Sequence, residues 1–377
     1  SPGTVRVIRE LEVSPDANGY LRQVVDGLCP GEWYRYGFFA VEGGEAVARG
    51  VLGEFRTALA EGALEPVTVA ISACNGGGNA PWPALQRTSD EYYDVFLHLG
   101  DMAYNDGSAT LAEFRESWQE YLAVDQGGET GGFALAYARA GLYATLDDHE
   151  ITNNFDPETI SPAVFDAAMT SYFEAIPLTD QPDGFRVWQS FRWGDTAEFI
   201  VLDCRTERLP STQDTAEATY ISAEQMAWLK DRLKNSPCHF KVVLNSVPIT
   251  DMPTIPWDLA QGDRWEGYPA QREDLLAFIT AENIANVWFV SGDFHTCFVS
   301  QVQPGATGVL GKTREIAVTG GNTNVLGDFL DPPQFAFGTS QPHACLITFD
   351  PAADEVLVRF IDADTGQESY AATLTQK

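Results

Sequence analysis

Lysine and long apolar runs are scarce in this sequence. Only five of its 377 residues are lysine, and 54 acidic residues outnumber 23 basic ones, which gives a formal net charge of −31. Such a charge disfavours general binding to nucleic acids or anionic membranes, whose phosphates repel it. No stretch approaches the roughly 20 apolar residues of a membrane-spanning helix, so we expect no transmembrane segment. An acidic surface instead favours solubility in salt.

The cysteines exclude one common class of metal site. No two of the six form a Cys-x-x-Cys pair, which rules out a zinc ribbon. Their even number permits disulfides in an oxidising compartment, but the sequence does not indicate how they would pair. The opening residues, Ser1 to Thr4, carry no signal peptide and resemble the interior of a domain. We therefore expect that upstream residues were removed or left out.

The first 60 residues differ in pattern from the rest of the chain. Alternating apolar and polar residues predict strands at 4–8, 19–28, 32–41 and 50–57. These strands resemble part of a fibronectin- or immunoglobulin-like β-sandwich. After them, apolar strands alternate with helical stretches, which is typical of a layered α/β fold. We predict a partial, truncated N-terminal all-β domain over 1–60 and a larger α/β domain over 61–377.

The larger domain has clear strand and helix signals. Apolar runs predict strands at 67–73, 95–99, 142–146, 197–202, 241–247 and 287–290, followed by a β-rich segment at 314–374. Helices are predicted at 110–125, 162–175, 222–235 and 269–281. Ser222 and Gln225 have the spacing of a capping box at the start of the third helix. Runs that are continuously apolar are typical of strands covered on both faces.

Residues that can bind metal follow five of these predicted strands. In open α/β sheets, reactive groups gather beyond the carboxyl ends of the strands. Core packing alone would not place them there, because burying such groups unpaired costs several kcal/mol. The residues are Cys74, Asp101, Tyr104, Asp147, Asp148, His149, Asn245, Asp293 and His295. The pattern predicts a two-metal hydrolase site.

The order and spacing of these segments resemble the calcineurin-like metallophosphoesterase superfamily, most closely its PhoD-like alkaline phosphatases. The matching segments are Cys74, Gly100–Tyr104, Asp147–Asn154, Asp203–Arg208 and Ser291–His295. The resemblance spans residues 67–370 and implies a layered β-sandwich flanked by helices, preceded by a small β domain. Three positions differ from the wider superfamily pattern, because Cys74, Tyr104 and Asp293 replace its usual residues.

The candidate ligands separate into two groups. The first consists of Cys74, Asp101, Tyr104 and His295. The second consists of Asp101 as a bridge together with Asp148, Asn245 and Asp293. A thiolate with a phenolate and a carboxylate suits Fe3+, whereas oxygen donors alone favour Ca2+ over Mg2+, Mn2+ or Zn2+. The resemblance implies the same pair, iron with calcium.

The resemblance further implies a phosphoester hydrolase in which a metal-bound hydroxide attacks phosphorus. His149 would assist the leaving alkoxide as a catalytic residue. Arg205 and Arg208 would clamp phosphate oxygens, and Asn153 or Asn154 would contact the substrate or add an oxygen ligand. Both phosphomonoesters and phosphodiesters are implied, as small-molecule or lipid substrates. Twin-arginine export to the periplasm or the medium is also implied, and no obligate protein partner is indicated.

Several of these residues also have a purely structural interpretation. Cys74 alone would usually be a small buried hydrophobe, and Arg205 and Arg208 could pair with Asp203 or Glu207. Two alternatives stay open for the whole chain. One is a phosphodiesterase of the phospholipase D type, and the other is a non-catalytic binding protein built on this fold. Relative turnover of phosphomonoesters, phosphodiesters and a phosphatidyl lipid would distinguish the phospholipase D type from an alkaline phosphatase. A sample that is loaded with metal but inactive would favour the binding protein.

Overall fold

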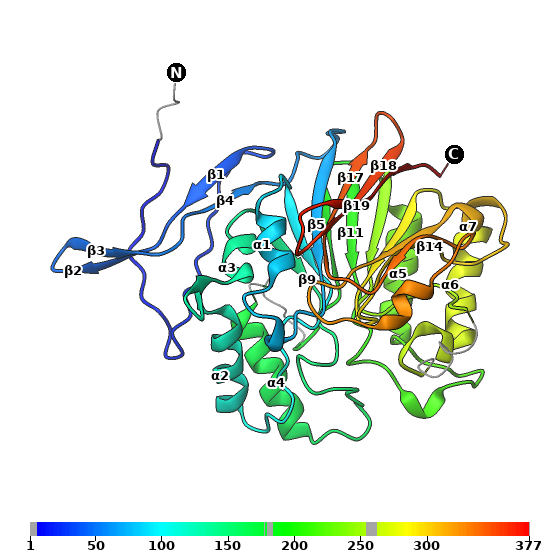
Figure 1. Ribbon diagram of the computed structural model, residues 1–377, viewed down its shortest axis with the longest axis horizontal. Coiled ribbons are helices and arrows are strands. Elements are labelled where there is room, and N and C mark those ends of the chain that lie inside the picture. The colour runs from blue at the N-terminus through cyan, green and yellow to red at the C-terminus, as the bar shows by residue number, and fades with distance from the viewer. Residues whose placement is uncertain (1–5, 177, 179–183, 254–261, 377) are drawn as a thin grey trace.

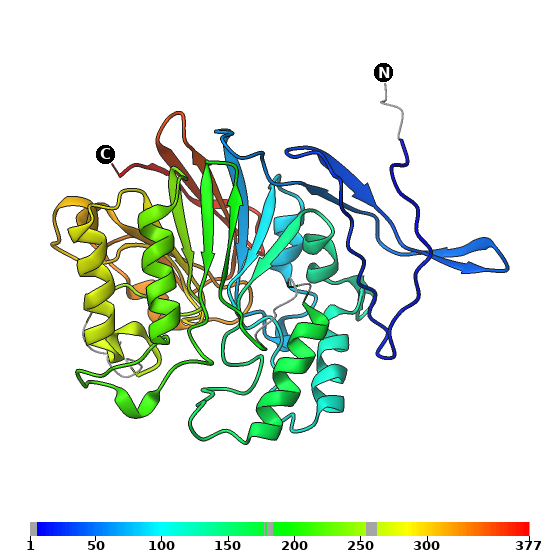
Figure 2. The same cartoon turned by 180° about the vertical axis from the view of Figure 1, so that it is seen from behind.

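The computed structural model describes residues 6–176, 178, 184–253 and 262–376. Two large β-sheets lie face to face at its centre, and helices cover the outer face of each sheet (Figure 1 and Figure 2). This arrangement confirms the predicted layered α/β fold class. Among the helices of the described ranges, none has the length and apolar character needed to cross a bilayer.

The two sheets have seven and six strands. The first has the order β10 (Gln189–Trp193), β11 (Ala197–Val201), β12 (Phe240–Leu244), β13 (Val287–Ser291), β15 (Arg314–Ala317), β14 (Cys297–Gln301) and β16 (Phe335–Thr339). The second has the order β19 (Glu368–Leu374), β18 (Glu355–Asp362), β17 (His343–Asp350), β5 (Val67–Ser72), β6 (Val95–His98) and β9 (Gly141–Ala144). Five of these strands, β15 to β19, form the predicted β-rich segment.

The main core lies between the two sheets. Val69 and Ile71 of β5 face this core from one sheet, and Val242, Leu244 and Val290 face it from the other. The opposite faces of the same strands are buried beneath helices. Central strands covered on both faces explain why the sequence shows continuous apolar runs there.

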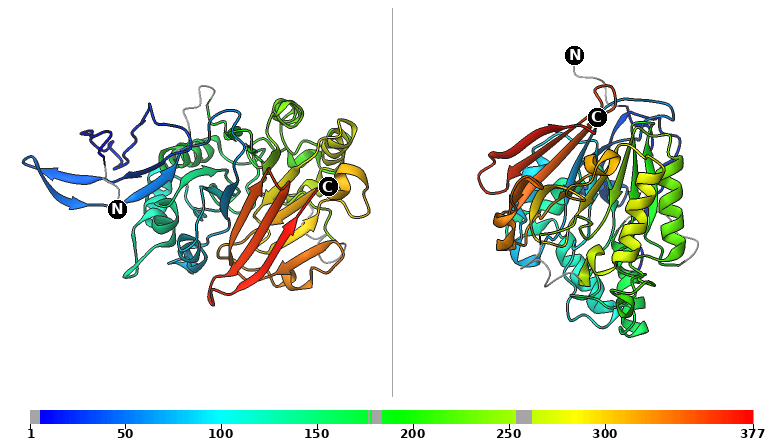
Figure 3. Two further views of the ribbon diagram at one scale, coloured as in Figure 1. Left: turned by 90° about the horizontal axis from the view of Figure 1, so that it is seen from above. Right: turned by 90° about the vertical axis from the view of Figure 1, so that its right-hand side faces the viewer.

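Helices form the two outer layers. The six-stranded sheet is covered by α1 (Pro83–Ser89), α2 (Leu111–Leu122), α3 (Gly132–Tyr137) and α4 (Pro162–Ala175). The seven-stranded sheet is covered by α5 (Ala223–Asn235) and α6 (Pro269–Ala281), and the short α7 (Gly308–Lys312) lies against α6. Figure 3 shows α5 and α6 on the side of the molecule opposite the strands β17 to β19. Shorter elements are the ladder of β7 (Asp125–Gln126) with β8 (Glu129–Thr130), and 3-10 turns at Gly77–Asn79, Pro210–Thr212, Trp265–Gly267 and Val325–Phe329.

The four predicted helices form where their start signals place them. The Ser222 side chain accepts a hydrogen bond from the Gln225 backbone N–H at 3.1 Å, as the capping spacing predicted. Thr110 and Glu113 form a reciprocal capping box at the start of α2. Helices α4 and α6 both begin at a proline, which lacks the N–H that would be unpaired at that position.

Parallel pairing brings the ends of the central strands together. Strand β5 pairs in parallel with β6, and β6 with β9. In the other sheet β11, β12, β13 and β15 are also parallel. The residues that follow β5, β6, β9, β12 and β13 therefore emerge at one common edge of the sandwich, where the sequence predicted the site.

The N-terminal segment departs from its prediction. Strand β1 (Trp33–Tyr36) pairs with β4 (Gly53–Arg56), and β2 (Phe39–Glu42) pairs with β3 (Glu45–Arg49) in a projecting hairpin (Figure 1). The strand predicted at 19–28 is wrong, because this extended stretch has no partner strand to pair with. Thr4 and Val5 of the strand predicted at 4–8 lie outside the described residues, and no strand forms at the described residues 6–8.

The same segment does not form a sandwich core within its described residues. Its two ladders are separate, and the side chains of β2 and β3 are all exposed. A β-sandwich needs two sheets whose inner faces pack on each other, and two isolated two-stranded ladders cannot supply that packing. A separate domain over 1–60 therefore stays a prediction, as does its boundary with 61–377.

Candidate metal centre

Three groups of metal-binding side chains meet at this edge. Within each group the candidate ligand atoms lie within 4.8 Å of one another. The groups are Cys74, Asp101 and His295; Asp101, Asp148 and His149; and Asp147, Asp148 and Asp293. Asp101 joins the first group to the second, and Asp148 joins the second to the third. Asp101 is therefore placed between two candidate sites, in the position expected of a bridging ligand.

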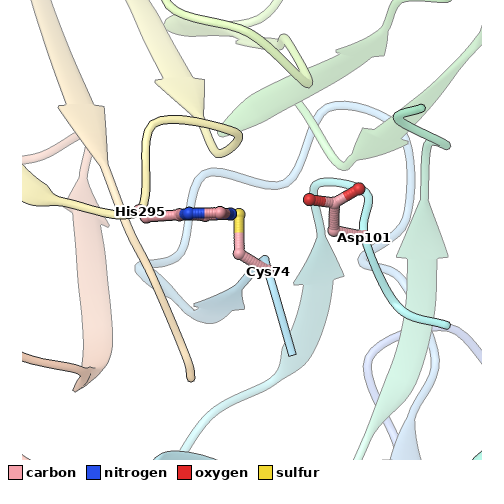
Figure 4. Close-up of side chains that lie close together, drawn as sticks. All are labelled: Cys74, Asp101 and His295. Atoms are coloured by element: carbon pink, nitrogen blue, oxygen red, sulfur yellow. The ribbon is translucent and has the colours of Figure 1, made fainter. Parts of the chain in front are cut away.

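Figure 4 shows the first group. The Cys74 sulfur lies against the His295 ring, and the Asp101 carboxylate points toward the same space. The three residues come from loops that follow β5, β6 and β13. All six cysteines lie in the described residues and are free thiols, so the structure contains none of the disulfides that the even count permitted.

Four of the candidate ligands have an unusual backbone. The φ angles of Cys74, Asp101, Asp293 and His295 are 57°, 56°, 60° and 54°. Residues other than glycine rarely adopt this left-handed region, and holding one there costs about 1–3 kcal/mol. Such conformations persist where the surrounding structure enforces them, and they cluster at functional sites. Here they occur at the turns that leave β5, β6 and β13.

The glycines beside two of these residues allow the strand ends to approach. A Cβ on Gly100 would lie 2.5 Å from the Asp147 Cβ, and a Cβ on Gly292 would lie 2.5 Å from the Ala73 Cβ. Contacts this short are not tolerated between carbon atoms. Glycine at these two positions therefore lets the loops that carry Asp101 and Asp293 come close to their neighbours.

Glu150 ties two of the ligand loops together. Its buried carboxylate accepts hydrogen bonds from the backbone N–H groups of Asp101 (3.0 Å), Met102 (2.5 Å) and Asp147 (2.8 Å). Burial raises the pKa of Glu150 to about 7, although the backbone donors oppose the rise. Because its oxygens are used by the backbone, we assign Glu150 a positioning role.

Arg205 provides the main positive charge in the cluster. Its guanidinium is fully buried and donates to both oxygens of Asp147, at 2.6 and 2.9 Å. It also donates to Asp263 and to Asp293, each at 2.7 Å. Burial alone would raise the pKa of Asp147, but the positive charge of Arg205 and its hydrogen bonds outweigh it and hold that pKa below its usual range. The partners of the Arg205 side chain are thus Asp147, Asp263 and Asp293. They are not the alternatives from the sequence, Asp203 and Glu207.

Arg205 does not offset the burial of three other carboxylates, those of Asp101, Asp148 and Asp293. Burial, followed by repulsion from neighbouring carboxylates, raises the pKa of Asp101 and Asp293 well above the ordinary range. Burial also raises the pKa of Asp148, although Arg205 opposes it. A carboxylate in such a place is stabilised in its charged form by a nearby cation. The charge distribution therefore fits a metal-binding site.

Tyr104 lies beside the bridging aspartate. Its hydroxyl donates to Asp101 Oδ2 at 3.1 Å and accepts from Asn322 Nδ2 at 2.6 Å. Its ring lies over the His149 ring, with centroids 3.9 Å apart. Burial, followed by the charge of Asp101, strongly raises the pKa of Tyr104. The expected ligand oxygen is thus next to the first metal group, although the ligand role itself stays a prediction.

His149 is oriented by an acidic residue that the sequence did not single out. Its Nδ1 lies 2.7 Å from Asp106 Oδ2, and Asp106 also accepts the Asn153 backbone N–H at 2.6 Å. The Asn154 backbone N–H donates to Asp148 Oδ2. Asn153 and Asn154 therefore contact the site through their backbones, while their side chains are exposed.

The expected role of Asn245 lacks support from its contacts. This buried amide oxygen accepts hydrogen bonds from Trp265 Nε1 at 3.3 Å and Cys204 Sγ at 3.5 Å. Its Nδ2 has no hydrogen-bond partner among the described residues. Because the oxygen is already engaged, metal binding by Asn245 stays a prediction.

Sequence reasoning missed three residues that contact the site: Asp106, Asp263 and Asn322. None follows a predicted strand directly, so the strand-end rule could not find them. Asp106 had a weak signal, since it lies two residues after Tyr104 in the same loop. Asn322 follows two glycines just beyond β15. The glycines indicate a loop, but nothing in the sequence indicates that this asparagine contacts the site. Asp263 had no signal at all.

This chain is similar in sequence to known phosphatases. A family model described as PhoD-like phosphatase matches residues 69–331. The protein named alkaline phosphatase D from Bacillus subtilis (strain 168) is 28% identical over 321 residues, which cover 74% of this chain and 53% of that protein. This chain thus spans about half the length of that curated relative.

Solved structures agree with the fold. A structure titled "Structure of PhoD" matches with a TM-score of 0.76 and 25% identity, over 93% of this chain and 75% of that one. A purple acid phosphatase from yellow lupin (Lupinus luteus) seeds matches with a TM-score of 0.66 and 14% identity, over 92% of this chain and 60% of that one. The second likeness shows the fold alone.

Proposed function

This chain belongs to the PhoD-like phosphatase family, and from that premise we propose that it is a metal-dependent phosphoester hydrolase. The proposed substrates are phosphomonoesters and phosphodiesters, as for an alkaline phosphatase of the D type. One observation carries the proposal: Asp101 joins two adjacent groups of buried or partly buried candidate ligands at the edge where five strands end. The relative named alkaline phosphatase D supports the reaction class.

We propose Fe3+ and Ca2+ as the resident ions. The donors proposed for iron are Cys74, Tyr104, His295 and Asp101, and those for calcium are Asp101, Asp148, Asn245 and Asp293. The soft sulfur and the phenol oxygen occur only in the first set, which supports different ions at the two positions. When bound, such ions neutralise charge on the phosphoryl oxygens and make a water molecule more acidic.

His149 is the proposed general acid for the leaving oxygen. Asp106 occupies its Nδ1, so Nε2 is the nitrogen left to hold a proton for the substrate. Stacking on Tyr104 fixes the plane of the imidazole beside Asp101. These contacts supply the orientation that general acid catalysis needs.

The remaining residues have positioning and binding roles in this proposal. Arg205 holds Asp147 and Asp293 in place through three short hydrogen bonds. Asn153 and Asn154 are exposed beside His149 and are proposed to contact the substrate. Location outside the cytoplasm, reached by twin-arginine export, stays a prediction.

Metal analysis tests the ion assignment directly. Protein purified without added metal would be examined by plasma emission spectroscopy and by its visible absorption spectrum. We expect iron with calcium and a visible band from the Tyr104 phenolate on Fe3+. Zinc or manganese without iron would overturn the ligand assignment but keep the hydrolase. A protein without stoichiometric metal would support the non-catalytic alternative.

Activity assays test the reaction class. Turnover would be compared on p-nitrophenyl phosphate, its bis ester and phosphatidylcholine. We expect hydrolysis of the first two, and its loss in Asp101→Asn. The matched control is Asp195→Asn, because Asp195 pairs with Arg192 in the turn that precedes β11, at the opposite edge of the sandwich. Turnover of phosphatidylcholine alone would instead favour a phospholipase D-type enzyme.

A further inference from the structure

Two arginine nitrogens converge on one carboxylate oxygen beside the acidic cluster. The Nη1 atoms of Arg205 and Arg208 both donate to Oδ1 of Asp263, at 2.7 and 2.6 Å. Guanidinium donors arranged in this way also suit a phosphoryl oxygen. The family resemblance already implies that these two arginines clamp phosphate oxygens. We propose that Asp263 occupies this phosphoryl-oxygen subsite as an internal competing anion until substrate or phosphate displaces its carboxylate.

Both arginines have anchors besides the Asp263 carboxylate. Arg205 is fixed by both oxygens of Asp147 and by Asp293. Arg208 donates from Nη2 to the Phe155 carbonyl at 2.9 Å. The two Nη1 donors therefore keep their places when the Asp263 carboxylate turns away. A subsite whose donors are fixed in advance loses little entropy when an anion enters.

Asp263 can release the arginines without moving its backbone. Its carbonyl oxygen accepts from the Tyr220 hydroxyl at 3.1 Å and from Arg208 at 3.3 Å. Its side chain is 25% exposed, whereas the side chains of Arg205 and Arg208 are 0% and 4% exposed. The carboxylate therefore has a path to solvent, and the buried guanidinium groups do not.

Charge balance singles out Asp263 among the carboxylates near Arg205. Four carboxylates lie within 4 Å of that guanidinium: Asp147, Asp148, Asp263 and Asp293. The other three form one of the candidate metal groups, and Asp263 does not belong to any of them. Exchange of its carboxylate for another oxyanion leaves the charge of the subsite nearly unchanged, and no covalent bond is broken.

Displacement of the Asp263 carboxylate by substrate or phosphate would affect turnover. This step of the inference rests on the proposed hydrolase function. An internal anion weakens substrate and phosphate alike, because both must displace it. Binding that is equally strong in ground and transition states does not raise kcat. Weaker binding of phosphate, however, reduces product inhibition. Asp263 would therefore favour product release at the cost of a higher KM.

The test is phosphate binding to Asp263→Asn. Inorganic phosphate would be titrated into the metal-loaded wild type and variant by isothermal titration calorimetry. The neutral amide competes less well for two guanidinium groups than a carboxylate does. We expect the Kd for phosphate to fall about tenfold, which corresponds to roughly 1.4 kcal/mol. Asp195→Asn is the control, since its side chain is also 25% exposed and pairs with Arg192, and its Kd should not change.

Two further variants keep the test decisive. In Arg208→Gln, the gain from Asp263→Asn should disappear, because one of the two donors is gone. Asp263→Ala should give the same gain as Asp263→Asn, and it replaces that variant if circular dichroism shows the latter to be unfolded. An unchanged or weaker affinity, with a lower kcat, would mean that Asp263 only positions Arg208, and it would overturn the inference.

Calorimetry also separates this inference from the proposed function. A wild type without esterase activity that still gains phosphate affinity on Asp263→Asn would overturn the hydrolase and support the subsite. An active enzyme whose phosphate affinity is the same in the wild type and in Asp263→Asn would support the hydrolase and overturn the role of Asp263.

Discussion

Glu150 and Arg205 hold the candidate ligands together through contacts that involve no ion. The first binds three backbone N–H groups of two ligand loops, and the second binds the carboxylates of Asp147 and Asp293. Supporting residues of this kind place ligands before the metal arrives. The geometry of the site is thus a property of the folded chain.

Tyr104 offers a direct readout of the first ligand group. Tyr104→Phe removes the phenol oxygen but keeps the ring that stacks on His149. We expect the visible band of the iron-loaded protein to vanish and iron content to fall, while calcium content is retained. Tyr137→Phe is the control, because that buried hydroxyl has no hydrogen-bond partner among the described residues. A band that survives in Tyr104→Phe would exclude the phenolate as its source.

Glu266 should make stability depend on pH. Burial raises its pKa from the ordinary 4.5 to about 7, although Arg264 opposes the rise. Between these values the unfolded chain is ionised while the folded protein still holds the proton. Unfolding then releases a proton, so the free energy of unfolding falls as the pH rises from about 4.5 to 7.

The variant Glu266→Gln should lessen that fall, because the amide does not titrate. Urea unfolding at several pH values, at constant metal load, measures the effect. Glu129→Gln, at the exposed β8, should leave the pH dependence of the wild type unchanged. Identical slopes for Glu266→Gln and the wild type would contradict the raised pKa.

How far the site was predictable depends on where each residue lies. Cys74, Asp101, Asp148 and Asp293 were predictable because parallel strands deliver their following residues to one edge. Asp263 comes from a loop between distant elements, and only the folded chain brings it to the arginines. Sequence spacing carries no information about such contacts.

At the scale of elements, sequence signals were more reliable for helices than for strands, because a helix forms its backbone hydrogen bonds within its own segment. Helices α2, α4, α5 and α6 were predicted, and each has a capping or proline signal at its own start. A strand needs a partner elsewhere in the chain, and the alternation at 19–28 has none. Short helices such as α1 and α3 were missed because six or seven residues contain too little periodicity.

The cap of α5 should contribute measurably to stability. Ser222→Ala removes the acceptor for the Gln225 N–H and should lower the free energy of unfolding by about 1 kcal/mol. Ser161→Ala is a matched control, because Ser161 occupies the same position of α4 without a side-chain hydrogen bond. Equal losses in both variants, measured by urea unfolding, would mean that the hydrogen bond is not the cause.

At the scale of the whole molecule, charge is the dominant feature. A net charge of −31 on one chain produces repulsion that the folded state concentrates and the unfolded state relieves. Salt screens this repulsion, since the Debye length shortens from about 10 Å at 0.1 M to about 3 Å at 1 M. The acidic surface should therefore make folding stability depend on ionic strength.

We expect the Tm to rise by several degrees between 0.05 and 1 M sodium chloride. Sucrose at equal osmolality is the control, because it favours burial without screening charge. Differential scanning calorimetry measures both series. A Tm that responds to sucrose but not to salt would show that the acidic side chains are locally balanced.

The left-handed backbone of Cys74, Asp101, Asp293 and His295 has an evolutionary consequence. Glycine adopts this conformation without strain, so replacing one of these candidate ligands by glycine would relieve a local cost and remove the side chain proposed to bind metal. A lineage released from selection for catalysis would tend to accumulate such replacements, because they improve stability where activity no longer matters. Screening a random library of this gene for thermal resistance alone should enrich glycine at these four codons, and retention of all four in distant descendants would be a signature of continued use.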